Sequence, residues 1–301
     1  MMKKTISQCM IVKNEEKNIR RALSWGKDIM CEQIVVDTGS SDRTVEIARE
    51  MGAKIFFFPW INDFAAAKNF AIDQAKGDWI AFLDADESFT PEDTKKIPEI
   101  LEYVGDDVDA LLIGIADLDE NNNITSGGTM IRFFVNRPDL RYVGKIHEHL
   151  VRKGRSELHL TDATKQLAFL HTGYQEQEKR DKSKFERNLN IILEILKQEP
   201  ENCDYLGYLG DTYFLDGKNE EAWDAYKKAV AAMPEKLGVY DQRSSYTYTN
   251  LLRVSQCLNA PEAEVEAIYK EAVEKLPKEP DFDCVMGDWY WRKGQYEKAV
   301  Q

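Results

Sequence analysis

Up to about residue 150, short apolar runs alternate with longer segments whose apolar residues recur at helical spacing. The short runs predict β-strands, and the longer segments predict amphipathic helices between them. Strand and helix in strict alternation imply right-handed crossovers and a largely parallel sheet. The predicted strands are TISQCMIV, QIVVD, KIFFFP and WIAFLD, and the predicted helices are EEKNIRRALSWG, DRTVEIAREMG and DFAAAKNFAIDQAKG.

From about Asp109 the apolar runs follow one another without long helices between them. ALLIGIADLD, MIRFFVN and IHEHLVRK are typical of strands. They predict antiparallel additions to the sheet. The fold class expected for residues 1–175 is therefore an α/β domain with a mixed, mostly parallel sheet.

After about Tyr174 the strand pattern stops and helical periodicity takes over. The segment 203–234 carries residues at the offsets of a tetratricopeptide repeat, namely Leu209, Gly210, Tyr213, Ala222, Tyr226, Ala229 and Pro234. A weaker copy follows in Leu252, Tyr269, Ala272 and Pro277, and a third begins at Met286, Gly287, Tyr290 and Ala299. Residues 176–301 are expected to form a helical linker and these repeats, with an irregular helical bundle as the alternative.

Composition narrows the class of protein. The chain has 301 residues with 43% hydrophobic content, enough for two domains with real cores. A net charge of −13 argues against nucleic acid as the partner, because phosphate binding needs a basic patch. No apolar run reaches the roughly 20 residues that span a bilayer, so we expect a cytoplasmic protein.

The stretch FLDADE sets three carboxylates, Asp84, Asp86 and Glu87, directly after an apolar run. On an extended segment Asp84 and Asp86 would face one site while Ala85 packs behind them. Carboxylates beyond the end of a parallel strand suit Mg²⁺ or Mn²⁺ together with a diphosphate. The alternative is an acidic turn that caps the next helix. An EF-hand is disfavoured, because the sixth loop position is Phe89 instead of glycine.

Three other stretches bear on these alternatives. VVDTGSSDRT ends a predicted strand at Asp37 and lacks the GxGxxG of a dinucleotide fold, which leaves Asp37 free to contact a base or ribose. CMIVKNEE ends the first strand with Asn14 and two glutamates. FAAAKNFAIDQAKGDW presents Lys68 and Asn69 on a helix ahead of the acidic strand.

Taken in order, MIVKNEE, VVDTGSSDRT, AAAKNFA and FLDADE resemble the nucleotide-binding half of family 2 glycosyltransferases with the GT-A fold, over residues 5–175. With YVGKIHEHL, FLHTGY and the repeats, the chain looks like a bacterial subgroup that includes the S-glycosyltransferases of glycocin peptides. The resemblance implies that Asp37 pairs with uracil, that Lys68 helps hold the nucleotide, and that Asp84 contacts ribose or metal. It also implies Val12, Asn14 and Ala85 as nucleotide contacts and Asp86 as a metal ligand.

Transfer of a sugar further needs a base that takes a proton from the acceptor. Glu148 in GKIHEHL is the candidate, with a structural salt bridge as the alternative. His171 in FLHTGY is a candidate third metal ligand, because imidazole suits Mn²⁺, although a structural histidine is the alternative. Arg132 and Arg137 are candidates for the sugar and acceptor sites or, as we prefer for Arg137, surface charges.

These residues together predict a metal-dependent inverting glycosyltransferase that uses a UDP-sugar and Mn²⁺ or Mg²⁺. Its acceptor is expected to be a peptide or protein held by the repeats, and the C-terminal repeats are expected to self-associate as a homodimer. The alternatives are transfer to a glycan or lipid-linked acceptor, a nucleotidyltransferase, and a repeat-based interaction module with a vestigial nucleotide domain. A nucleotidyltransferase would need a Gly-rich, basic loop near the first strand, where CMIVKNEE is acidic.

Overall fold

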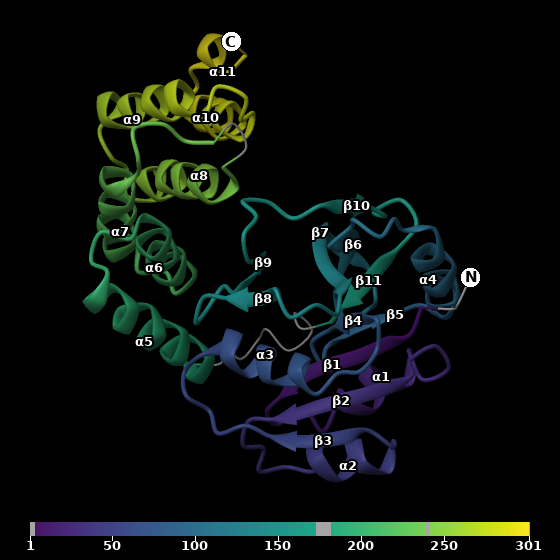
Figure 1. The fold of residues 1–301 in the computed structure, drawn as a ribbon. Helices are drawn as coiled ribbons and strands as arrows, with labels where there is room; N and C mark the ends of the chain where they lie inside the picture. The colour runs from purple at the N-terminus through teal and green to yellow at the C-terminus, as the bar shows by residue number, and fades with distance from the viewer. Residues whose placement is uncertain (1–3, 173–181, 239–240, 301) are drawn as a thin grey trace. The chain divides into compact units, whose positions relative to one another are not determined.

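The computed structural model describes residues 4–172, 182–238 and 241–300 (Figure 1). The chain forms two compact units, Met1–Arg180 and Asp181–Gln301. The domain boundary predicted between residues 175 and 176 lies outside the described residues.

The first unit is built on one mixed sheet (Figure 1). Its strands lie in the order β3-β2-β1-β4-β7-β6-β11-β5, with β10 paired to β6. β3, β2, β1 and β4 run parallel, whereas β7 is antiparallel to both of its neighbours. The strands of this sheet are β1 (Ile6–Val12), β2 (Glu32–Asp37), β3 (Lys54–Phe57), β4 (Trp79–Phe82), β5 (Glu87–Phe89), β6 (Ala110–Leu118), β7 (Ile124–Val135), β10 (Leu160–Asp162) and β11 (Ala168–His171). The predicted α/β class, with antiparallel additions, is confirmed.

Helices cover both faces of this sheet because its central strands are apolar on both sides. α1 (Ile19–Ser24) and α2 (Thr44–Glu50) pack against β1 and β2 through Met10, Val12 and Val35. α3 (Phe64–Asp73) packs on the other face with Cys9, Ile34 and Phe82. α4 (Pro91–Tyr103) joins a third cluster that includes residues of β4, β7 and β11. Burial on both sides accounts for the nearly continuous apolar runs in the parallel strands.

A small antiparallel hairpin of β8 (Leu140–Val143) and β9 (His149–Arg152) stands apart from the main sheet. The strand predicted over IHEHLVRK starts later than expected, because β9 begins at His149. Glu148 therefore lies in the loop between the two strands of the hairpin. Because Glu148 is not part of a strand, its side chain need not follow the alternating directions of strand side chains and can be directed toward α3.

The extended course predicted for residues 84–86 is wrong. β4 ends at Phe82, and Ala85 and Asp86 lie in a turn before β5. The Glu87 N–H donates to the Asp84 carbonyl at 3.1 Å and closes this turn. Ala85 is buried, as predicted, but the turn directs the two aspartates to different partners.

The second unit is helical throughout its described residues. Its helices are α5 (Lys182–Gln198), α6 (Cys203–Leu215), α7 (Asn219–Ala232), α8 (Gln242–Cys257), α9 (Glu262–Lys275), α10 (Asp281–Arg292) and α11 (Tyr296–Ala299). The predicted all-helical region is confirmed. The repeat offsets fall on helix pairs, with Gly210 on α6 facing Tyr226 on α7. Tyr226 is fully buried, and its hydroxyl donates to Asp211 at 2.8 Å.

Candidate active site

The carboxyl ends of β1, β2 and β4 meet at one edge of the sheet. β1 lies between the other two strands, with Val12 beside Asp37 and Cys9 beside Phe82 in the parallel register. Ligands of open α/β sheets bind beyond this edge. The last residues of these strands and the loops that follow them include six predicted site residues, namely Val12, Asn14, Asp37, Asp84, Ala85 and Asp86.

Asn14 and Asp37 organise the loops after β1 and β2. The Asp37 carboxylate accepts hydrogen bonds from the N–H groups of Gly39 at 3.0 Å and Ser40 at 3.1 Å, and Asp37 is buried. Asn14 has a φ of 58°, which a short amide side chain tolerates. Its side-chain oxygen accepts from the Ser41 N–H at 2.8 Å. The two loops are thereby held together as one surface.

Residues 84–87 form what is called here the acidic turn. Two of its carboxylates, Asp84 and Glu87, share the guanidinium of Arg132. Arg132 Nη2 lies 3.3 Å from Asp84 Oδ2 and donates to Glu87 Oε1. Arg132 and Glu87 are buried, so for Arg132 the surface-charge alternative is wrong. Arg137 instead pairs with Asp139 at 3.1 Å and is partly exposed. A buried cation beside the acidic turn offsets much of its negative charge.

The pKa values in this acidic turn follow from burial and from the nearby cations. Burial raises the pKa of Glu87 to about 7, against the lowering effect of Arg132. Burial also acts to raise the pKa of Asp84, but Lys68, Arg132 and His171 hold it below its ordinary value. Asp84 therefore loses its proton at a lower pH than Glu87 does.

Asp86 and His171 face each other across the edge strands. His171 ends β11, which pairs with β5 so that His171 lies opposite Glu87. His171 Nε2 is 3.4 Å from Asp86 Oδ2, and Nδ1 donates to Asp117 Oδ1 at 2.8 Å. The hydrogen bond to Asp86, with support from Asp117, raises the pKa of His171 to about 9.

The donor atoms of Asp86 and His171 are of the types that bind a divalent metal. A carboxylate oxygen and an imidazole nitrogen are donors that Mn²⁺ accepts, and a second carboxylate on the far ring nitrogen is the usual orienting partner of a metal-bound histidine. Among residues 4–172, 182–238 and 241–300 no group of three or more histidine, cysteine, aspartate or glutamate side chains converges as a metal site. Asp86 and His171 could supply two protein ligands to a divalent metal, and a bound diphosphate or water would supply the others.

Lys68 and Glu148 form a buried ion pair. Lys68 Nζ on α3 lies 2.6 Å from Glu148 Oε1 in the β8–β9 loop, and their side chains are 7% and 12% exposed. The ammonium also lies over the rings of Phe82 and Tyr142, at 5.2 and 4.9 Å from their centroids. Burial acts to lower the pKa of Lys68, but Asp84, Tyr142 and Glu148 raise it above its ordinary value.

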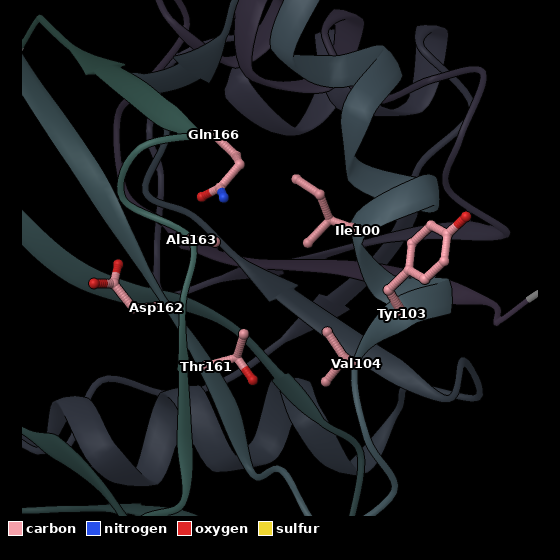
Figure 2. A pocket seen from close by; sticks show the side chains of 7 residues that line it. All are labelled: Ile100, Tyr103, Val104, Thr161, Asp162, Ala163 and Gln166. Atoms are coloured by element: carbon pink, nitrogen blue, oxygen red, sulfur yellow. The ribbon is translucent and has the colours of Figure 1, made fainter.

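A hollow of about 200 Å³ lies elsewhere on the same unit, between the end of α4 and β10 (Figure 2). Thr161, one of its lining residues, pairs with Leu111 near the start of β6, whereas His171 pairs with Asp117 near its end. Figure 2 shows Asp162 directed away from Ile100, and its carboxylate accepts from Thr164. The hollow is therefore separated from the acidic turn by the length of β6.

The predictions from sequence missed two features of this site. Asp117, which orients His171, ends the apolar run ALLIGIAD just as Asp84 ends WIAFL, so the same pattern could have identified it. The residues around Arg132 in the sequence did not predict that it pairs with the acidic turn. Arg132 lies on β7, and β7 comes next to β4 only because the two strands pair antiparallel in the folded sheet.

The fold of the first unit is that of an α/β domain, and a known family model matches it. Residues 7–152 match the family described as Glycosyl transferase family 2, so the first unit carries a domain that this family model describes. The chain is 33% identical over 231 residues to the SPbeta prophage-derived glycosyltransferase SunS of Bacillus subtilis (strain 168), covering 75% of this chain and 53% of SunS. It is also 33% identical over 226 residues to a TPR repeat-containing protein of Synechococcus elongatus, covering 72% of this chain and 55% of that protein. The recognition of the family and of repeat-containing relatives is confirmed, and the chain spans about half the length of these relatives.

Solved structures to which the chain is similar include S. aureus TarS 1-349 in complex with UDP-GlcNAc, at 16% identity and a TM-score of 0.47, covering 85% of this chain and 91% of that one. Glucosyl-3-phosphoglycerate synthase from Mycobacterium tuberculosis, in complex with Mn²⁺, UDP and glucosyl-3-phosphoglycerate, matches at 22% identity and a TM-score of 0.32 over 39% of this chain and 44% of that one. Across the part of the chain that the structure describes, no helix is long and apolar enough to cross a bilayer.

Proposed function

We propose that this protein is a metal-dependent inverting glycosyltransferase that moves a sugar from a UDP-sugar to an acceptor. The observation that carries the proposal is the buried Lys68–Glu148 pair beside the acidic turn, within a family 2 domain. A carboxylate held near a diphosphate site has the chemistry of a proton acceptor. The proposal requires three roles from this edge of the sheet, namely nucleotide binding, metal binding and proton transfer.

The nucleotide role is assigned to the loops after β1, β2 and β4. Asp37 would accept the N3 proton of uracil, since its carboxylate retains acceptor capacity beside its two backbone donors. The other proposed nucleotide contacts are Val12, Asn14, Asp84 and Ala85, with Lys68 as the contact predicted from the resemblance. The hydrogen bonds that join these loops support a surface that is already formed before the nucleotide binds.

Asp86 and His171 would hold the divalent metal, Mn²⁺ or Mg²⁺, with Asp117 orienting the imidazole. When bound, such an ion stabilises the negative charge that develops on the departing diphosphate. The Asp86 carbonyl accepts from both the N–H and the hydroxyl of Thr172, each at 3.1 Å. These contacts fix the turn that carries the Asp86 carboxylate.

Glu148 would act as the base. The acceptor atom attacks the anomeric carbon while its proton passes to the Glu148 carboxylate. The bond between that carbon and the diphosphate oxygen breaks, and its electron pair stays on the diphosphate. A single in-line displacement of this kind inverts the anomeric centre.

For the acceptor we propose a peptide or protein side chain, supported by the helix pairs of the second unit. Stacked repeats of this kind commonly hold an extended or helical peptide. Self-association through the C-terminal repeats is part of the same proposal, supported by the exposed side chains of Trp291, Tyr296 and Val300. A cytoplasmic location stays a prediction from the sequence.

The first experiment is calorimetric titration of the full chain with UDP, in the presence of Mn²⁺ and in the presence of a chelator. We expect UDP binding that tightens at least about tenfold with Mn²⁺. ADP, GDP and CDP serve as matched controls, since they share the diphosphate and differ in the base. Absence of UDP binding under both conditions would favour the interaction module with a vestigial nucleotide domain.

A further inference from the structure

Lys68 contacts the candidate base more directly than any other side chain described for it. Its ammonium lies 2.6 Å from Glu148, and both side chains are largely withdrawn from solvent. At this depth each charge depends on the other for stabilisation, because water is replaced by protein atoms. Removal of Lys68 would leave Glu148 as a nearly buried carboxylate without its closest cation.

The loop that carries Glu148 is attached to one side of α3 at three points. The Phe64 N–H donates to the Lys145 carbonyl at 2.8 Å, and the Asn69 side chain exchanges two hydrogen bonds of 2.9 Å with the backbone of Tyr142. Lys68, between Phe64 and Asn69 in sequence, supplies the third point through Glu148. α3 thus holds the β8 end of the loop through the backbone of Tyr142 and Lys145, and it holds Glu148, near the β9 end, by charge.

The far side of the hairpin is anchored independently. Arg152 on β9 pairs with the fully buried Asp109 at 2.7 Å and with Asp139 at 3.1 Å. His147, next to Glu148, has a φ of 54°, in the left-handed region that non-glycine residues adopt only when their surroundings require it. The backbone at Glu148 is therefore constrained from several sides, and Lys68 acts on the carboxylate itself.

Other charges that face the ion pair come from several elements. Asp84 lies in the acidic turn after β4, Arg132 is on β7, and the Tyr142 hydroxyl is on β8. His147 and His149 flank Glu148 in sequence and are exposed. Lys68 and Arg132 are the two buried cations among these groups, and Arg132 contacts Asp84 and Glu87.

We propose that Lys68 is a positioning residue for Glu148, which fixes the direction of the carboxylate and supplies its counter-charge, so that Lys68 acts on proton transfer and not on nucleotide binding. This inference rests on the proposed function. It assigns Lys68 a role different from the nucleotide contact implied by the family resemblance. If Lys68 positions Glu148, its removal should lower kcat and leave the affinity for UDP unchanged. If Lys68 contacts the nucleotide, its removal should weaken the affinity for UDP.

The test compares Lys68→Met, Lys68→Arg and Glu148→Gln in the full chain. The activity measured is release of UDP by transfer to water, from UDP-glucose or UDP-N-acetylglucosamine, whichever the wild type turns over faster. For Lys68→Met we expect kcat near neutral pH to fall about 10²-fold, because the carboxylate loses its direction and its counter-charge. The UDP dissociation constant measured by calorimetry should change by no more than about twofold.

A pH profile separates positioning from a merely structural effect. Lys68→Met removes the closest positive charge from a carboxylate that is only 12% exposed, so the acidic limb of its kcat profile should move to higher pH and activity should partly return under alkaline conditions. Lys68→Arg retains the cation and should keep the wild-type limb. In the Glu148→Gln background, Lys68→Met should cause little further loss of kcat, since residues that act as one unit are not additive.

Lys54→Met is the matched control, because Lys54 pairs with Glu32 at the same distance of 2.6 Å in the same unit, away from the acidic turn. Its kcat, pH profile and UDP affinity should equal those of the wild type. If Lys68→Met does not fold, the double variant with Glu148→Gln, in which neither group is charged, supplies the comparison with Glu148→Gln alone.

Three results would overturn the inference. These are a UDP affinity weakened by about tenfold or more, an acidic limb that stays in place, or a full additional loss of kcat in the Glu148→Gln background. Failure of the proposed function looks different, since the wild type would then neither bind UDP nor release it from a UDP-sugar. Wild-type kcat in Glu148→Gln would reject the base and, with it, this role of Lys68.

Discussion

Replacing Gly210 by alanine should destabilise the helical unit, although alanine is the better helix former. A Cβ built on Gly210 would lie 2.4, 2.5 and 2.9 Å from three ring atoms of Tyr226. Carbon atoms normally approach to about 3.5–4.0 Å, so the closest contact overlaps by about 1 Å. Tyr226 is fully buried and its hydroxyl is bonded to Asp211, which also pairs with Arg243 at 2.7 Å. The ring therefore cannot withdraw without breaking other contacts.

The size of the effect follows from two opposing contributions. Overpacking of a well-packed core costs about 1–3 kcal/mol, and three close contacts belong at the upper end of that range. Alanine in place of glycine in a helix returns about 1 kcal/mol. The net loss in the free energy of unfolding is about 2 kcal/mol, which corresponds to a melting temperature lowered by about 8 °C for a unit of this size.

Far-ultraviolet circular dichroism during urea and thermal unfolding measures this loss. Gly238→Ala is the control, because a Cβ built there meets no atom within 4 Å, and its stability should match the wild type. Adding Tyr226→Leu to Gly210→Ala should recover part of the loss relative to the sum of the single changes. A Gly210→Ala midpoint equal to or above that of the wild type would refute the argument from packing.

Three further predictions concern the first unit. Asp86→Ala should reduce the tightening of UDP binding by Mn²⁺ by at least about tenfold, because a proposed metal ligand is removed; calorimetry checks this against Asp162→Ala, and unchanged Mn²⁺ dependence contradicts it. Asp37→Asn should reduce the preference for UDP over CDP by about tenfold, and equal affinity of the wild type for both nucleotides would remove the uracil role. The pKa of Glu32 is held below its ordinary value of 4.5, because hydrogen bonds from Lys54, Ser7 and the Lys76 N–H outweigh burial. A depressed carboxylate pKa contributes stability that is present above the unfolded value and lost as pH falls, so Glu32→Gln should be less stable than the wild type by about 1–2 kcal/mol at pH 7. This difference should shrink below pH 4.5 in urea titrations, and a constant difference would disprove it.

Much of the fold followed from local pattern. The alternation of apolar runs and amphipathic segments predicted the parallel strands and the helices between them, because burial on two faces leaves a continuous apolar strand. The helix pairs of the second unit followed from repeat offsets, in which Gly210 is small because Tyr226 occupies the adjoining space. The prediction for residues 84–86 failed, because a turn closed by Glu87 replaced the strand geometry on which it relied.

The sequence by itself determined which residue types end the strands, and hence that acids, an amide and a histidine gather at one edge of a sheet. Only the tertiary structure decided which of them touch. Lys68 meets Glu148, Arg132 meets Glu87, and His171 lies between Asp86 and Asp117. These pairs join distant parts of the chain, and they depend on strand order, register and loop direction. Local periodicity encodes which face of an element is buried, whereas the partner of each charge is set by the packing of elements that are far apart in sequence.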